Sequence, residues 1–204
     1  MAFEVLGFDI LLERSKTKTT SKIDFLGTNF RRGNENIELS ELFEVKEFIC
    51  LFFGAGWCPI SRNFMKTLKN LYKILNKSEK TIEILFVSSD ENEDNFEKYY
   101  SQMPWWTLDF WDKRHERFKK KFKVVNIPTL IVLNKNGEVV TFEGRSDVQS
   151  MKYECIEEWR SKYLSMCKIL LLIFGNLASE SGLKPWLIEV NHMPSFNQDT
   201  KGKF

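Results

Sequence analysis

The sequence is poor in the residues that build metal centres and disulfide frameworks. Its 204 residues include only four cysteines and two histidines. His115 and His192 lie far apart, and neither has an acid or a cysteine at ligand spacing. The cysteines show no metal-ligand spacing and no short paired spacing; they are Cys50, Cys58, Cys155 and Cys167. We therefore expect no metal, no cofactor and reduced thiols, as in a cytoplasmic protein.

The chain also lacks an excess of one charge and a long apolar run. Its 30 basic and 28 acidic residues leave a formal net charge of +2, which does not favour a nucleic-acid partner. The apolar stretch Ile169 to Phe174 is far shorter than the about 20 residues that span a bilayer. The start, Met1 to Glu4, has no basic region followed by an apolar one. We expect no membrane span and no secretory signal.

What the chain does have is apolar and aromatic material for a core, at 43% and 14% of its residues. Phe48–Phe53 and Thr81–Val87 are apolar runs typical of strands covered on both faces. Between them, apolar residues at helical spacing predict a helix over Pro59–Leu75. Thr129–Leu133 and Glu138–Phe142 flank an Asn-Gly pair, which predicts a hairpin. Alternating strands and helices predict an α/β fold, with a central mixed sheet and helices on both faces.

Less regular segments complete this prediction. Strands are expected at Phe3–Leu12, Phe25–Asn29 and Ile37–Leu39, and Ser40 is a candidate helix N-cap. Helices are expected at Arg114–Lys123 and Val148–Tyr163. The predicted domains are an N-terminal extension at 1–23, one α/β domain at 24–166 and a C-terminal extension at 167–204.

The most informative motif is Trp57-Cys58-Pro59-Ile60-Ser61, which stands between a buried strand and a helix. Backbone N–H groups at a helix start favour a thiolate, so Cys58 is a candidate nucleophile. A dithiol cycle needs a second cysteine three positions later to release the mixed disulfide. Ser61 occupies that position, and a hydroxyl cannot form the disulfide. The motif therefore keeps a nucleophile and lacks its resolving thiol.

Three blocks in the expected order resemble the tryparedoxin and nucleoredoxin branch of the thioredoxin superfamily. The first is Trp57–Arg62, where the family has Trp-Cys-Pro-Pro-Cys-Arg. The second, Val87–Trp105, contains Ser-Ser-Asp-Glu, a Tyr-Tyr pair and Met-Pro-Trp, and the third is Val125–Leu130. The resemblance implies a thioredoxin-like fold, an exposed Trp57 and a cis Pro128 beside Cys58.

The chain departs from the family at Ser61, Ile60 and Ser89, where the family has a cysteine, a proline and, in tryparedoxins, a tryptophan. Because the lost cysteine is a chemical loss, we expect a binding or structural protein rather than an enzyme. The resemblance extends to apicomplexan thioredoxin-like proteins of this branch that associate with cortical microtubules. It implies a protein partner, tubulin, and a place at the cytoskeleton. The alternative is a monothiol oxidoreductase or redox sensor that acts through Cys58.

The C-terminal extension is a second candidate for partner binding. It exceeds what the family body needs and contains Trp186 within an apolar triplet. Tryptophan is enriched among residues that dominate binding energy, so Trp186 is our candidate anchor. The competing interpretation is that the extension docks on the protein's own body.

Overall fold

The computed structural model describes residues 24–38, 42, 44–77 and 81–180, with residues 170–180 described as helical backbone only. The predicted strand at Phe3–Leu12, the Ser40 cap and Trp186 lie outside the described residues. The chain divides into two compact units, Met1–Tyr163 and Leu164–Phe204. Among the described residues, no helix has the length and apolar character needed to cross a membrane.

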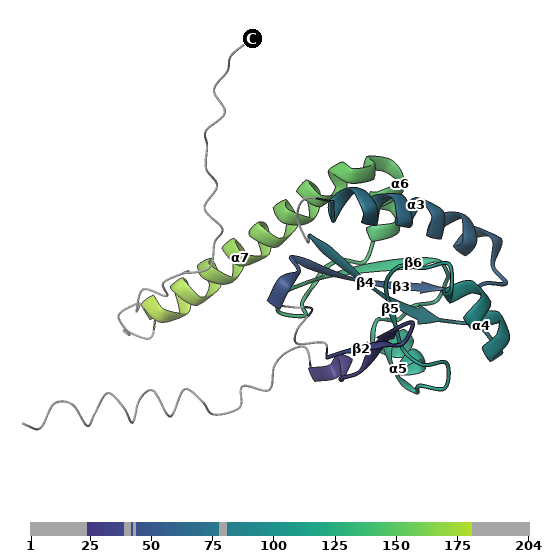
Figure 1. Ribbon diagram of the computed structural model, residues 1–204. Coiled ribbons are helices and arrows are strands. Elements are labelled where there is room, and N and C mark those ends of the chain that lie inside the picture. Colours follow the sequence, from purple (N-terminus) through teal and green to yellow (C-terminus); the bar gives the residue numbers. More distant parts are fainter. Residues whose placement is uncertain (1–23, 39–41, 43, 78–80, 181–204) are drawn as a thin grey trace, which may run out of the picture. The chain divides into compact units, whose positions relative to one another are not determined.

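The first unit is built on one mixed sheet whose strands follow the order β2-β1-β5-β4-β3-β6-β7 (Figure 1). Strands β3, β4 and β5 run parallel to one another, whereas β6, β7, β1 and β2 pair antiparallel. In chain order the elements are η1 (Asp24–Leu26), β1 (Phe30–Arg32), β2 (Glu35–Ile37), β3 (Phe48–Gly54), α3 (Pro59–Leu75), β4 (Ile82–Ser88), α4 (Glu93–Tyr100), β5 (Trp106–Thr107), α5 (Arg114–Lys121), β6 (Thr129–Asn134), β7 (Val139–Thr141), α6 (Gly144–Met151), η2 (Lys152–Glu154) and α7 (Cys155–Glu180).

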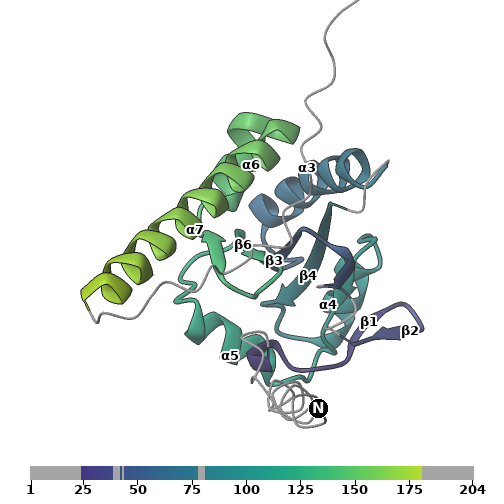
Figure 2. The same cartoon turned by 90° about the vertical axis from the view of Figure 1, so that its left-hand side faces the viewer.

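Alternate side chains of β3 fill two separate cores, one on each face of the sheet. Phe48, Cys50 and Phe52 pack with α3, α4, α6 and the start of α7. Ile49, Leu51 and Phe53 point the other way and pack with α5 and the residues around β1. This is the period-two alternation of a strand with both faces covered. Figure 2 shows α5 on one side of the sheet and α3 and α6 on the other, so the predicted α/β architecture is confirmed.

The central strands, the α3 helix and the terminal hairpin match their predictions. Strands β6 and β7 pair antiparallel across the Asn-Gly turn, and Gly137 has φ +75° there. That left-handed conformation is one that glycine adopts without steric cost.

Two other predictions were wrong. The predicted strand Phe25–Asn29 is instead the short helix η1 followed by a turn, with left-handed backbone at Gly27 and Asn29, which an extended strand cannot contain. The ring of Phe25 packs against Phe118 and Phe122 of the α5 region. The predicted single helix Val148–Tyr163 is broken at Lys152, whose φ is +54°. The chain there passes from α6 through η2 into α7.

Candidate functional site

The candidate thiol site lies at one end of the sheet, where three segments from different parts of the chain meet. Strands β3 and β4 run parallel and pair Gly54 with Ser88 at their ends. Strand β6 is antiparallel to β3 and pairs Thr129, its first residue, with Phe53. The residues after β3, the residues after β4 and the residue before β6 therefore share this end. They carry Cys58, the turn at Ser89 and Asp90, and Pro128.

Hydrogen bonds from the turn after β4 hold the loop that precedes Cys58. The N–H of Ser89 donates to the carbonyl of Gly54 at 2.9 Å, and the Gly56 N–H donates to Oδ1 of Asp90 at 2.8 Å. The indole Nε1 of Trp57 donates to the carbonyl of Ser89 at 3.2 Å. Gly54, Gly56 and Trp57 are therefore all tied to one short segment, Ser89 and Asp90.

Gly56 is required by a close approach to helix α4. A Cβ atom built at this position would lie 2.9 Å from Cβ of Tyr99 and 3.4 Å from the carbonyl oxygen of Asn95. Side-chain carbons essentially never come so near to one another, and neither atom belongs to a flexible side-chain end. The backbone of the loop can pass this close to α4 only without a side chain.

Cys58 is the N-cap residue of α3, and Pro59 begins the helix. Only 7% of the cysteine is exposed. Desolvation of the thiolate by burial opposes ionisation, but hydrogen bonds from the Ser61 hydroxyl and from the backbone of Ser61 and Ile60, together with the charge of Arg62, outweigh it. These groups hold the pKa of the Cys58 thiol below its ordinary value. Cys58 can therefore act as a thiolate nucleophile.

Ser61 occupies the place of the resolving thiol and is fully buried. Its carbonyl accepts a hydrogen bond from the Tyr99 hydroxyl at 2.9 Å. Within the described part of the chain its own hydroxyl has no partner at ordinary hydrogen-bond geometry. The hydroxyl dipole stabilises the Cys58 thiolate and so contributes to the lowered pKa of that thiol. Ser61 thus supports the nucleophile electrostatically and cannot replace a thiol chemically.

Two of the other three cysteines are buried in the core of the first unit. Cys50 lies in the middle of β3 and Cys155 at the start of α7, and both are fully buried. Burial raises the pKa of Cys155 to about 12 and that of Cys50 well above its ordinary value. Cys167 is partly exposed and belongs to the second unit. Cys50 and Cys155, the cysteines that share the first unit with Cys58, are therefore poor candidates for a resolving role.

Pro128 is buried and follows a cis peptide bond from Ile127. Its carbonyl accepts a hydrogen bond from Arg145 of α6 at 3.3 Å. Its position follows from the pairing of Thr129 with Phe53, which places it at the same end of the sheet as the loop before Cys58.

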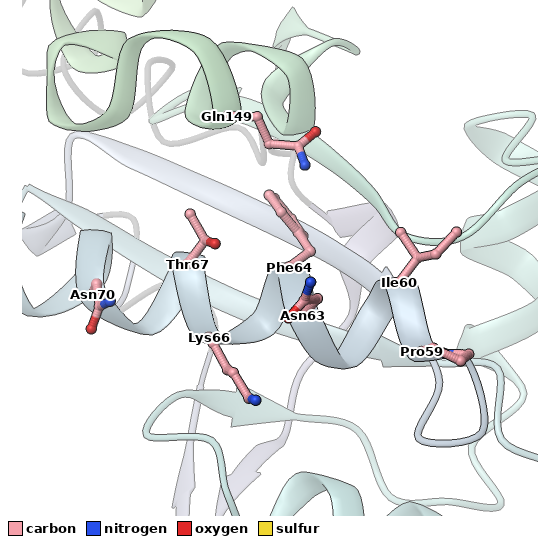
Figure 3. Close-up of a pocket in the computed structure, with 8 residues that line it drawn as sticks. All are labelled: Pro59, Ile60, Asn63, Phe64, Lys66, Thr67, Asn70 and Gln149. Carbon is pink, nitrogen blue, oxygen red and sulfur yellow. The ribbon is translucent and has the colours of Figure 1, made fainter.

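Exposed apolar side chains and two hollows surround the thiol site. Trp57 is 54% exposed and Val125 88% exposed, and Ile60 and Phe142 are also exposed. Figure 3 shows the first hollow, about 420 Å³, which follows α3 from Pro59 to Asn70 beneath Gln149 of α6. The second, about 410 Å³, contains Pro128, Val125 and Phe142 and also reaches Gln149. Gln149 lines both hollows, so the two are neighbours.

Two residues of the site have roles that the sequence analysis did not indicate. Asp90 precedes α4, which begins at Glu93 with Asn92 as its cap, and its carboxylate accepts the N–H of Gly56 in the cysteine loop. Tyr99 of α4 donates from its hydroxyl to the carbonyl of Ser61. His115 was set aside as neither a metal ligand nor a catalytic residue, yet it is buried behind this turn. The one available signal was Asp90 itself, an acid placed directly after a buried strand.

Comparison with known proteins places this geometry in a family. The thioredoxin-like family matches residues 46–139. Among solved structures, native tryparedoxin I from Crithidia fasciculata is 31% identical, with a TM-score of 0.60, and the match covers 65% of this chain and 94% of the tryparedoxin. The chain belongs to the thioredoxin superfamily, in its nucleoredoxin and tryparedoxin branch. Tryparedoxin I from Leishmania major is 32% identical, with a TM-score of 0.58 over 63% of this chain and 88% of that one.

Two nucleoredoxin relatives are much longer than the segment that matches this chain. A probable nucleoredoxin 1 of Arabidopsis thaliana is 32% identical over 77% of this chain. Nucleoredoxin of Bos taurus is 36% identical over 60% of it. These matches span 29% and 28% of the two relatives, respectively. The chain therefore corresponds to less than a third of each of these proteins.

Proposed function

We propose that this thioredoxin-like chain binds protein partners through the surface around Cys58 and does not turn over disulfides. The observation that carries the proposal is Ser61, which is fully buried where a dithiol site needs its second sulfur. The loop before Cys58 is nevertheless held by three hydrogen bonds to the turn after β4. A surface that keeps its shape after losing its turnover chemistry suits recognition.

Exposed apolar groups beside the two hollows support a protein partner. Trp57 and Val125 present large apolar area to solvent, and aromatic side chains of this kind are enriched where proteins meet. The amides of Asn63, Asn70 and Gln149 line the neighbouring groove and offer both donors and acceptors to a partner's backbone. Polymerised tubulin, in the cytoplasm at the cytoskeleton, is the partner we propose on the resemblance alone.

The test is co-sedimentation of the full chain with microtubules, using two exposed tryptophans as a matched pair. Trp57 adjoins Cys58 in the motif loop, whereas Trp111, which is 77% exposed, follows β5 and donates to Glu93 of α4. We expect Trp57→Ala to weaken binding by at least about tenfold, as a binding hot spot does, and Trp111→Ala to leave it unchanged. Equal loss in both variants contradicts a role for the Cys58 surface.

Two further variants test whether binding needs the Cys58 thiol and whether it needs the C-terminal extension. Cys58→Ser should bind as the unmodified chain does, because the proposal needs no covalent bond. Deletion of residues 181–204, which removes Trp186, tests the C-terminal extension as an additional contact and should weaken binding. Absence of microtubule binding in the full chain would exclude tubulin as the partner.

A second candidate function is monothiol capture, and the lowered pKa of Cys58 is the observation that favours it. The thiolate would attack a disulfide R–S–S–R′, forming Cys58–S–S–R and releasing R′–S⁻. Because Ser61 cannot displace the bound sulfur, the mixed disulfide would persist until an external thiol reduced it. If Cys58→Ser abolishes association and a reductant releases the partner, this function replaces the first.

A further inference from the structure

His115 is a buried imidazole whose two ring nitrogens face backbone groups of opposite character. It lies in the first turn of α5. Nε2 is 2.9 Å from the carbonyl oxygen of Asp109, and a carbonyl can only accept, so Nε2 carries the hydrogen. Nδ1 accepts the N–H of Ser88 at 3.1 Å and must be bare. The two contacts therefore fix a single neutral tautomer.

From Ser88 a continuous set of hydrogen bonds leads to the loop that carries the thiol. The Ser88 hydroxyl donates to Oδ2 of Asp90 at 2.9 Å and accepts the Asp90 N–H at 2.9 Å. Oδ1 of the same carboxylate accepts the N–H of Gly56 at 2.8 Å. The carbonyl of Gly56 accepts from Arg62 at 2.6 Å, and Arg62 is one of the groups that stabilise the Cys58 thiolate.

We propose that His115 is a positioning residue for Cys58: through Ser88 and Asp90 the neutral imidazole holds the Gly56 end of the cysteine loop, and protonation of the imidazole releases it. The inference goes beyond partner binding and needs only that Cys58 is a reactive thiol. It also holds whichever proposed function is correct, because both place Cys58 on this loop.

The release follows from the geometry at Nδ1. Protonation would place a second hydrogen opposite the Ser88 N–H, so two donors would face each other and one of them must move. Ser88 is the first link of the set, and its displacement carries Asp90 with it because two hydrogen bonds join them. The Gly56 N–H then loses its acceptor, and Gly56 precedes Cys58 by only two residues.

Burial, together with nearby cations, keeps His115 neutral at ordinary pH. Desolvation is the largest influence and lowers the pKa of His115; the charges of Lys119 and Arg114 act in the same direction. The Asp109 carbonyl and the Asp112 carboxylate raise the pKa of His115, but by less than the other groups lower it. From α4 the packing group is the uncharged ring of Phe96, 6.3 Å away between centroids. Release is therefore confined to pH values below the usual histidine range.

If His115 only filled space in the core, the expected results would differ. Two variants distinguish this packing role from the positioning role. His115→Asn keeps an oxygen near the position of Nδ1 to accept the Ser88 N–H, but it cannot be protonated in this range. His115→Leu fills similar space and offers no acceptor at all. A structural residue would lose stability in both variants, with no change in how the loop responds to pH.

The experiment measures hydrogen-exchange protection of individual amides in the full chain between pH 7.5 and 4.5. We expect protection of the Ser88 and Gly56 amides to fall about tenfold more than that of Leu51 and Leu85 in the central sheet. His115→Asn should abolish this extra loss, and His115→Leu should show low protection of both amides at every pH. The inference is overturned if His115→Asn retains the loss, or if Ser88 responds while Gly56 does not.

The thiol itself gives a second readout in the same samples. The rate of Cys58 with 2,2′-dipyridyl disulfide is divided by its rate in the urea-unfolded chain at the same pH. This ratio should move toward one at low pH in the unmodified chain and stay constant in His115→Asn. Fully buried Cys50 and Cys155 report global opening, and they should remain unreactive throughout. Their simultaneous reaction with Cys58 would show unfolding in place of loop release and would overturn the inference.

Discussion

The hydroxyl of Tyr99 donates a hydrogen bond to the main-chain carbonyl of Ser61 across 2.9 Å. The two residues are 38 positions apart and belong to α4 and α3. The β-carbon of the same tyrosine lies where a side chain at Gly56 would have to be. Tyr99 therefore contacts the chain on both sides of Cys58, and helix α4 acts as the support against which the thiol site is built.

Removal of this hydroxyl should destabilise the protein. Tyr99→Phe leaves a buried carbonyl without that donor, which typically costs about 1 kcal/mol. Urea denaturation should show a lower midpoint with an unchanged slope. Tyr153→Phe is the matched control, because Tyr153 is exposed. An equal effect of the two substitutions would contradict the supporting role of the Tyr99 hydroxyl.

Insulin reduction should be negligible in the unmodified chain and should rise in Ser61→Cys. The substitution places a sulfur at the buried position beside Cys58, where it can resolve the mixed disulfide. Turnover is followed by the precipitation of insulin chains in the presence of dithiothreitol. Ser161→Cys, on the exposed side of α7, adds a thiol elsewhere and should not restore activity. Turnover of the unmodified chain at the rate of an ordinary thioredoxin would show that another cysteine resolves Cys58.

The four thiols should alkylate in an order set by ionisation as well as exposure. At pH 7 we expect Cys58 to react first, because its pKa lies below the ordinary value, although Cys167 is more exposed. Cys155, with a pKa of about 12, and Cys50 should stay unmodified. Brief iodoacetamide treatment followed by peptide mass spectrometry ranks the four. Faster reaction of Cys167 at pH 7 would show that burial of Cys58 outweighs stabilisation of its thiolate.

Glu83 should give the stability of the protein a measurable pH dependence. Its carboxylate is buried in β4, where it accepts from Tyr72 at 2.9 Å and lies 3.7 Å from Lys46. Desolvation raises the pKa of Glu83 despite these partners. Between its unfolded and folded pKa values the folded chain keeps a proton that the unfolded chain has released. Its contribution to stability therefore falls as pH rises through that interval and is constant above it.

The variant Glu83→Gln isolates this contribution, because glutamine still accepts from Tyr72 and does not titrate. The difference in unfolding free energy between the variant and the unmodified chain should change with pH just above the ordinary range of a glutamate. Urea denaturation at a series of pH values between 4 and 7 measures it. Glu91→Gln, at an exposed position, should show no such change. A pH-independent difference for Glu83→Gln would contradict the raised pKa.

Local pattern was sufficient wherever the structure depends on neighbours in the chain. The apolar run of β3, the helical spacing of α3 and the Asn-Gly turn before β7 each carry their conformation in a few consecutive residues. The same holds for Cys58 at a helix start and for the loss of its resolving partner at Ser61. Pattern failed at Phe25–Asn29 and at Lys152, where left-handed residues interrupt segments whose composition suits a regular element.

The sequence by itself determined the order of the elements, the two-sided burial of the central strand and the presence of one motif cysteine without its partner. Only the tertiary structure decided that Asp90 binds Gly56, that Tyr99 supports Ser61 and that His115 reaches Ser88. These pairs join residues 34, 38 and 27 positions apart. Periodicity reports which face of an element is buried, but a hydrogen-bond partner is set by the register in which distant elements pack. The groups that lower the pKa of Cys58 lie within four residues of it, so the sequence already indicated a reactive thiol, whereas the residues that support its loop became visible only in the folded chain.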